Sequence, residues 1–164
     1  MLSERVIGKK AWVTGAAHGI GRASAWALAE AGADVAISDI NEKGLEETAE
    51  YIRKLGRKAL VLPADITKEN EIEETINTIV DKWGKLDIAY CNAGTFQDIP
   101  AEDMPLEEFE RVIKVNLTGA FISSRAAGKA MIKQKNGSII LTASMSGHIV
   151  NIPQCQCAYN SSKA

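Results

Sequence analysis

Residues 12–24 read WVTGAAHGIGRAS and place three glycines, Gly15, Gly19 and Gly21, between an apolar run and an alanine-rich run. The apolar run at residues 11–14 is typical of a buried strand. The run that follows keeps helical spacing of its apolar residues, at Ile20, Ala23, Ala27, Leu28 and Ala31. The sequence therefore predicts a strand, a glycine-rich turn and a helix.

The same order of strand and helix repeats along the chain. Further strands are predicted at residues 35–38, 59–62, 86–91 and 138–141, and helices at residues 45–55, 72–83, 109–121 and 159–164. Short connections between them indicate a parallel sheet with helices on both faces. Right-handed crossovers make this a doubly wound, Rossmann-type three-layer α/β/α fold. No linker is visible, so we predict one domain over residues 1–164.

The composition excludes several classes of protein. The chain has 164 residues, 46% of them hydrophobic, and a net charge of -2, so no broad basic surface for nucleic acid is predicted. The sequence contains no run of 18 or more apolar residues, so no membrane span is predicted. The first ten residues lack the apolar core of a secretion signal. Three cysteines, Cys91, Cys155 and Cys157, favour reduced thiols in the cytoplasm. They do not have the spacing of a zinc site, and we predict no metal.

The glycine turn is a candidate site for an anion. The unpaired N–H groups and the dipole at a helix N-terminus favour negative charge. Gly15 can adopt a positive φ, Gly19 lets a pyrophosphate approach the main chain, and Gly21 lets the helix press against the strand. The spacing Gly-x-x-x-Gly-x-Gly is a weak signal alone, and a glycine-rich turn without a ligand is the alternative.

Asp39 follows the second predicted strand, 18 residues after Gly21. An acid at this place can bind the ribose hydroxyls of a dinucleotide and repel a 2′-phosphate, which favours NAD over NADP. The alternative is that Asp39 caps the helix that starts near Asn41. His18 and Arg22 flank the glycine loop and could offset phosphate charge, or they could face solvent.

Tyr159 and Lys163 stand four residues apart and share one face of a helix. A free phenol ionises near pH 10, and a nearby lysine cation stabilises the phenolate, so the pair could exchange a proton near neutrality. An ordinary exposed helix face is the alternative. Ser144, just past the fifth strand, could bind a substrate oxygen. Asn116 lies on an apolar helical stripe and is either a buried structural amide or part of a polar relay.

These features occur in one order on the alternating strand and helix pattern: Thr14-Gly15-x-x-x-Gly19-x-Gly21, Asp39, Asp65, Asn92-Ala93-Gly94, Asn116, Ser144 and Tyr159-x-x-x-Lys163. The set resembles the short-chain dehydrogenase/reductase family over essentially the whole chain. The resemblance implies an NAD(P)-dependent oxidoreductase that forms a homodimer or homotetramer. It implies hydride transfer between a secondary alcohol or ketone and the nicotinamide.

The resemblance also implies roles for single residues. Tyr159 would be the general acid and base, Lys163 would stabilise its phenolate and bind the nicotinamide ribose, and Ser144 would orient the substrate oxygen. Asn116 would hold a water that links Lys163 to solvent. The implied cofactor-binding residues are Thr14, Gly15, His18, Gly19, Ile20, Gly21, Asp39, Ile40, Asp65, Ile66, Asn92, Ala93, Gly94, Tyr159 and Lys163.

Residues 143–154, ASMSGHIVNIPQ, resemble those of polyol and sugar dehydrogenases of the family. The implied substrate residues are Ser144, His148, Asn151, Gln154 and Tyr159; a polar surface loop is the alternative. Family members continue past the position of Ala164, so we expect this chain to lack a C-terminal part. The alternative function is therefore a non-catalytic nucleotide-binding fragment or interaction module.

Overall fold

The computed structural model describes residues 5–164 and contains one sheet of five parallel strands. All five predicted strands are present, each within two residues of its expected bounds, which confirms the doubly wound α/β fold. The order across the sheet is β3-β2-β1-β4-β5. The strands are β1 (Lys10–Thr14), β2 (Asp34–Ser38), β3 (Ala59–Val61), β4 (Ile88–Cys91) and β5 (Ser138–Leu141).

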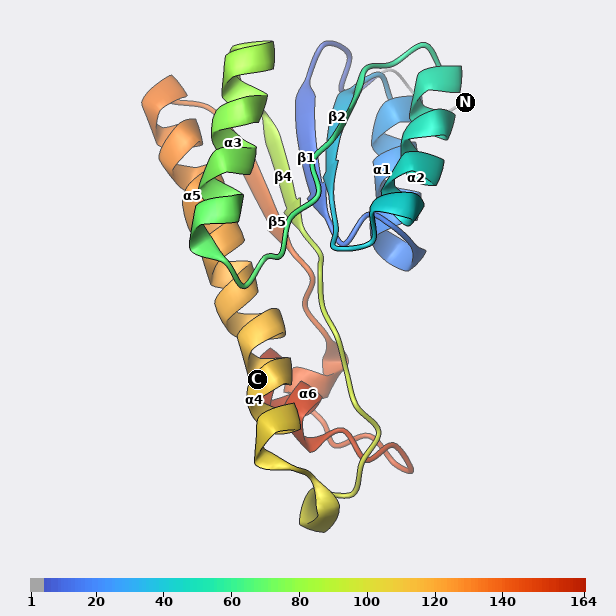
Figure 1. Ribbon diagram of the computed structural model, residues 1–164, viewed down its shortest axis with the longest axis vertical. Helices are drawn as coiled ribbons and strands as arrows, with labels where there is room; N and C mark the ends of the chain where they lie inside the picture. The colour runs from blue at the N-terminus through green and yellow to red at the C-terminus, as the bar shows by residue number, and fades with distance from the viewer. Residues whose placement is uncertain (1–4) are drawn as a thin grey trace.

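Helices cover both faces of the sheet (Figure 1). On the central strand β1, Trp12 packs into the cluster with α3 (Glu69–Trp83) and α5 (Ala120–Gln134). Ala11 and Val13, its neighbours in the strand, pack into the cluster with α1 (Gly19–Glu30) and α2 (Glu42–Lys54). Because successive side chains of a strand point to opposite faces, both faces of β1 are buried. This double burial explains why residues 11–13 of the strand are all apolar.

The predicted helix after the glycine turn is present as α1, but its buried face differs from the predicted stripe. The buried residues are Gly21, Ala25 and Ala29, whereas Ile20 is 65% exposed. Alanines occur on several sides of this helix, so the spacing of apolar residues alone does not determine which face is buried. Contact with the sheet selects it, because a Cβ at Gly21 would lie 2.1 Å from the Gly15 carbonyl oxygen. Only glycine permits so close an approach.

The helix predicted at residues 109–121 is part of a longer helix that contains a π-helical stretch. It comprises α4 (Leu106–Ile113), the π-helical stretch η2 (Lys114–Gly119) and α5. A π turn inserts an extra residue and so rotates the faces of the helix that follow it. Asn116 is 4% exposed, as predicted, but Leu117 and Phe121 of the predicted inner stripe are 54% and 57% exposed. That part of the stripe was wrong.

The strand order reverses between β1 and β4. From β1 the chain moves outward to β2 and β3, and it then returns through α3 to pair β4 with the other side of β1. The segments after β4 and β5 run toward α4 and α6 (Cys157–Lys163), which lie beyond the sheet (Figure 1). A crevice at the carboxyl ends of the strands follows from this topology.

The structure locates the three cysteines as free thiols. Cys91 is buried at the end of β4, and burial raises the pKa of its thiol to about 12. Cys155 is exposed. Within residues 5–164, no helix has the length and apolar character to cross a membrane, and no cluster of three or more His, Cys, Asp or Glu could hold a metal ion. The predicted lack of a secretion signal falls partly on residues 1–4, outside the described residues.

Two buried carboxylates lie at the opposite, amino-terminal edge of the sheet. Asp34 lies 2.5 Å from Lys10 Nζ and 3.2 Å from Arg57, and Asp87 lies 2.9 Å from Lys85 Nζ. Burial by itself raises the pKa of each carboxyl group. Hydrogen bonds and the charges of these cations outweigh burial, so the pKa of both Asp34 and Asp87 lies below its ordinary value of 3.8. The ionised form of each group therefore stabilises the fold.

The sign of this effect predicts acid instability. A carboxyl group whose pKa is lower in the folded state adds stability above its unfolded pKa of 3.8, and this stability is lost as the pH falls through the folded pKa. Asp34→Asn should lower the free energy of unfolding at neutral pH by about 2 kcal/mol and flatten its decline below pH about 4. Urea unfolding between neutral and acidic pH measures both. Asp81→Asn, at an exposed position, is the control; an equal pH slope in Asp34→Asn and the wild type would contradict the assignment.

Gly21 and Gly128 both lie in helices, so the same substitution can be compared at a crowded and at an open position. A Cβ at Gly21 would lie 2.1 Å from main-chain oxygen, whereas at Gly128 its nearest neighbour is an Ile139 side chain at 3.7 Å. Gly21→Ala should destabilise the protein by about 2–3 kcal/mol through overpacking. Gly128→Ala should leave it unchanged or stabilise it by about 0.5–1 kcal/mol, since alanine favours helix. Thermal and urea unfolding compare the two, and equal effects would refute the packing argument.

Candidate active site

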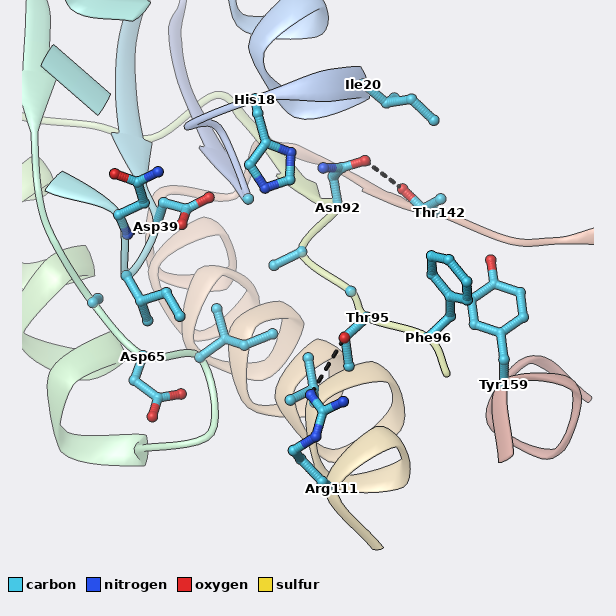
Figure 2. Close-up of a pocket in the computed structure, with 18 of the residues that line it drawn as sticks. His18, Ile20, Asp39, Asp65, Asn92, Thr95, Phe96, Arg111, Thr142 and Tyr159 are labelled. Atoms are coloured by element: carbon cyan, nitrogen blue, oxygen red, sulfur yellow. Dashed lines mark hydrogen bonds between the residues drawn. The ribbon is translucent and has the colours of Figure 1, made fainter. Parts of the chain in front are cut away.

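A pocket of about 570 Å³ opens at the carboxyl ends of the strands (Figure 2). It brings together the glycine loop, the segments after β2, β3 and β4, and side chains of α4, η2 and α6. Most of the predicted cofactor residues line it: Gly15, His18, Ile20, Asp39, Ile40, Asp65, Ile66, Asn92, Ala93, Gly94, Tyr159 and Lys163. Segments far apart in the sequence therefore form one continuous cavity.

The glycine loop has the geometry of a phosphate cradle. Gly15 has φ +67°, and a Cβ there would lie 2.7 Å from Ala93 Cα, so packing requires glycine. Gly19 has φ +56°, and a Cβ there would meet nothing within 4 Å, which leaves the main chain bare. α1 begins after His18 with no capping side chain and no acidic residue in its first turn. Its N-terminal N–H groups therefore suit the phosphates of a dinucleotide.

Asp39 lies at one end of the pocket with its carboxylate held by the main chain. Its Oδ2 accepts from Ala17 N at 3.2 Å, and its Oδ1 accepts from Asn41 N at 3.0 Å. The alternative role as cap of α2 falls to Asn41, whose own side chain accepts from Gly44 N. Asp39 is therefore free of that role.

The two basic residues that flank the loop have different environments. His18 is exposed and lines the pocket on the side of Asp39 (Figure 2). Arg22 turns away to α2, where it donates to Thr48 Oγ1 at 3.1 Å and pairs with Glu47 at 3.0 Å. Arg22 thus joins α1 to α2, and its expected role beside a phosphate is not supported by its position.

Threonines fix the ends of β1, β4 and β5 to one another. Thr14 Oγ1 accepts from Asn92 N and Ala93 N, both at 3.0 Å, and is buried behind the pocket. The hydroxyl of Thr142 lies 3.0 Å from the Tyr90 hydroxyl. It also lies 3.2 Å from Asn92 Oδ1 (Figure 2). The wall that contains Asn92 and Ala93 is therefore held from both sides.

Tyr159 and Lys163 lie on α6 at the other end of the pocket. The Lys163 Nζ lies 5.7 Å from the centre of the Tyr159 ring and donates to the Thr142 carbonyl oxygen at 2.7 Å. Burial lowers the pKa of Lys163 from its ordinary value of 10.5. Figure 2 shows Tyr159 on the side of the pocket remote from Asp39 and Asp65. The predicted pair thus shares one helix face within one site.

Asn116 does not line the pocket but supports it from behind. Its Oδ1 accepts from Thr95 N at 2.8 Å, and its Nδ2 donates to the Thr95 carbonyl oxygen at 2.8 Å and to Ser162 Oγ at 2.9 Å. The buried amide therefore has a partner for its oxygen and for each of its two N–H groups. It joins the segment after β4, which lines the pocket, to α6.

The predicted substrate residues other than Tyr159 are not part of this pocket. Ser144 Oγ accepts from Ser146 N at 3.1 Å and so caps the short turn η3 (Met145–Gly147). The amide of Asn151 donates to Ser146 Oγ at 3.1 Å, and His148 and Gln154 are exposed. These residues lie on the segment between β5 and α6.

Sequence reasoning missed several lining residues. Thr95 and Phe96 directly follow the predicted Asn92-Ala93-Gly94 and could have been included for that reason. Arg111 lies four residues before Val115 on the helix of Asn116, so helical spacing places the two on one face. Arg111 donates to Thr95 Oγ1 at 3.3 Å (Figure 2). The full set missed is Asn41, Ala64, Thr95, Phe96, Arg111, Val115 and Thr142.

Comparison with known proteins identifies the family of the chain. A family model for short chain dehydrogenase matches residues 9–164. A probable NADP-dependent mannitol dehydrogenase of Yarrowia lipolytica is 46% identical over 159 residues, which are 95% of this chain and 57% of that protein. A sorbose reductase of Candida albicans is 42% identical over 160 residues, 96% of this chain and 57% of that protein.

Solved structures give the same result. A short-chain type dehydrogenase/reductase from Mycobacterium marinum matches 98% of this chain and 63% of its own with a TM-score of 0.95 at 43% identity. An NAD+-bound xylitol dehydrogenase matches 97% of this chain and 61% of its own with a TM-score of 0.92 at 38% identity. The chain thus spans about three fifths of the length of these relatives. By its fold, its crevice and these matches, the chain belongs to the short chain dehydrogenase family.

Proposed function

We propose that the protein is an NAD-dependent oxidoreductase that transfers hydride between a secondary alcohol, of the polyol or sugar class, and the nicotinamide. One observation carries the proposal: Tyr159 and Lys163 lie at one end of a pocket whose other end has the bare glycine loop and Asp39. A proton-transferring pair and a dinucleotide cradle in one cavity are the parts that this reaction needs.

Tyr159 would hold and move the proton. In oxidation, the Tyr159 phenolate would accept the proton of the substrate hydroxyl as that alcohol becomes a carbonyl, and bound NAD would supply the acceptor for the hydride of the same carbon; reduction would be the reverse. Lys163, 5.7 Å from the ring, would stabilise the phenolate by its charge. Half-burial of this lysine strengthens that interaction, because less water screens it.

Other side chains would bind and orient. The N-terminal N–H groups of α1 would hold the phosphates, the Asp39 carboxylate would bind the ribose hydroxyls, and Asp65 with Ile66 would contact the adenine. Ser144 would orient the substrate oxygen. Thr14 holds Asn92 and Ala93, and Asn116 holds Thr95, so the Asn92-Ala93-Gly94 segment would form one wall without moving on binding.

Asp39 favours NAD in this proposal. Two main-chain N–H groups hold its carboxylate at the pocket, where a 2′-phosphate would meet negative charge. The relatives include a probable NADP-dependent mannitol dehydrogenase and an NAD+-bound xylitol dehydrogenase, so similarity alone does not select a cofactor.

The names of the relatives support a polyhydroxylated substrate, since they refer to mannitol, sorbose and xylitol. His148, Asn151 and Gln154, which lie on the polar loop before α6, would bind further hydroxyls of such a substrate.

Removal of the Tyr159 hydroxyl tests the catalytic role. In the full-length protein, Tyr159→Phe should lower kcat by about 10²–10⁴-fold, because no other group replaces the proton acceptor. Cofactor affinity should change by less than about twofold. NADH absorbance with a panel of polyols, sugars and simple secondary alcohols measures turnover, and fluorescence titration measures affinity.

Tyr51→Phe, on α2 away from the pocket, is the matched control and should retain full turnover. Cofactor binding by the wild type without turnover of any alcohol would instead support a non-catalytic nucleotide-binding module.

Removal of the Asp39 charge tests cofactor selection. Asp39→Ala should raise the ratio of kcat/KM for NADP to that for NAD by at least about tenfold, a change of about 1.4 kcal/mol in relative transition-state binding. Initial rates with both cofactors at fixed substrate give the ratio. Asp81→Ala, which is exposed on α3, should leave it unchanged; an unchanged ratio in Asp39→Ala would remove Asp39 from the argument.

A further inference from the structure

The hydroxyl of Ser162 lies where α6 meets the segments behind the pocket. Ser162 is 6% exposed. Its Oγ accepts from Asn116 Nδ2 at 2.9 Å and donates to the Tyr159 carbonyl oxygen at 2.7 Å. A single buried side chain thus bonds both to η2 and to the main chain of the residue proposed to carry the proton.

These bonds continue beyond Asn116 to the pocket wall. The Asn116 amide uses its oxygen and its nitrogen to bind the N–H and the carbonyl oxygen of Thr95, both at 2.8 Å. Thr95 lines the pocket. A continuous set of hydrogen bonds therefore runs from the segment after β4, through η2, to α6. Loss of the Ser162 oxygen would leave a buried amide N–H without a partner.

α6 depends on such contacts because it is short. It comprises seven residues, Cys157–Lys163, and isolated helices of this length are unstable in water. The other short side-chain bond that fixes it is that of Lys163 Nζ to the Thr142 carbonyl oxygen, at 2.7 Å. Lys163 is itself proposed to bind the cofactor ribose, so this second contact depends on the cofactor. The bond between Ser162 and Asn116 does not depend on the cofactor.

We propose that Ser162 is a positioning residue that fixes α6, and with it Tyr159 and Lys163, against Asn116 and Thr95. This role rests on the proposed function. Ser162 does not line the pocket, and it acts through the helix backbone. Its loss should displace the Tyr159 phenol and the Lys163 ammonium relative to the pocket wall but leave the glycine loop and Asp39 in place. The effect should thus appear in proton transfer and not in binding of the adenosine half of the cofactor.

The experiment compares three variants of the full-length protein. Ser162→Ala removes the hydroxyl, Ser162→Cys keeps a side chain of similar size with a weaker hydrogen-bonding group, and Ser161→Ala changes the exposed neighbour as a control. Ser162→Ala should lower kcat by about tenfold, because small displacements of reacting groups have large effects on rate. Ser162→Cys should give an intermediate loss, and in both Ser162 variants the Kd of NAD should change much less than kcat.

Two further measurements separate positioning from a loss of folding. The acidic limb of the pH profile of kcat should shift in Ser162→Ala and not in Ser161→Ala. The kcat of the double variant of Ser162→Ala with Asn116→Ala should be no lower than that of Asn116→Ala alone, because both changes break one set of contacts. If Ser162→Ala does not fold, Ser162→Cys provides the same comparison.

The possible failures are distinguishable. If the wild type turns over a substrate but Ser162→Ala matches Ser161→Ala in kcat and pH profile, the role of Ser162 is refuted and the proposed function stands. A loss of kcat that only parallels losses in Tm and NAD affinity also refutes it, since that is a structural effect alone. A wild type that oxidises no alcohol and reduces no ketone overturns both.

Discussion

The close approach of main chain to main chain at the end of β1 is the constraint on which the rest of the molecule depends. A Cβ at Gly21 would lie 2.1 Å from the Gly15 carbonyl oxygen, and one at Gly15 would lie 2.7 Å from Ala93 Cα. Side chains at either position would push α1 away from β1, or β1 away from the segment after β4. With glycines there, the N-terminus of α1 meets the crevice between β1 and β4, where its N–H groups can bind an anion.

The walls of the crevice owe their order to polar groups that satisfy one another. Thr14 binds the main chain of Asn92, the hydroxyl of Thr142 lies against the Asn92 side chain, and Lys163 donates to the Thr142 carbonyl oxygen. Residues of β1, of the segments that follow β4 and β5, and of α6 thus share one set of bonds. Buried polar groups that all have partners hold their positions, whereas a single unpaired one is costly. A site built in this way is arranged before any ligand arrives.

Stability and function are assigned to opposite edges of the sheet. At the amino-terminal edge, Asp34 and Asp87 are paired with lysine and arginine side chains, so their charges serve the fold. At the carboxyl-terminal edge, the Asp39 carboxylate is held by main-chain N–H groups and lines the pocket. The same residue type therefore has different partners at the two edges.

The sequence by itself determined the strands, the alternation with helices and the two ends of the pocket. Buried parallel strands such as β1 are apolar runs, and the glycine spacing and the pair Tyr159 and Lys163 are visible within single segments. The tertiary structure alone decided which face of α1 is buried, where the helix widens around Asn116, and that Arg111 and Thr142 reach the pocket. It also revealed Ser162, which sequence reasoning passed over between Tyr159 and Lys163. The physical reason is that periodicity belongs to one segment, whereas a hydrogen bond such as that between Asn116 and Ser162 joins residues 46 apart and exists only once the chain has folded.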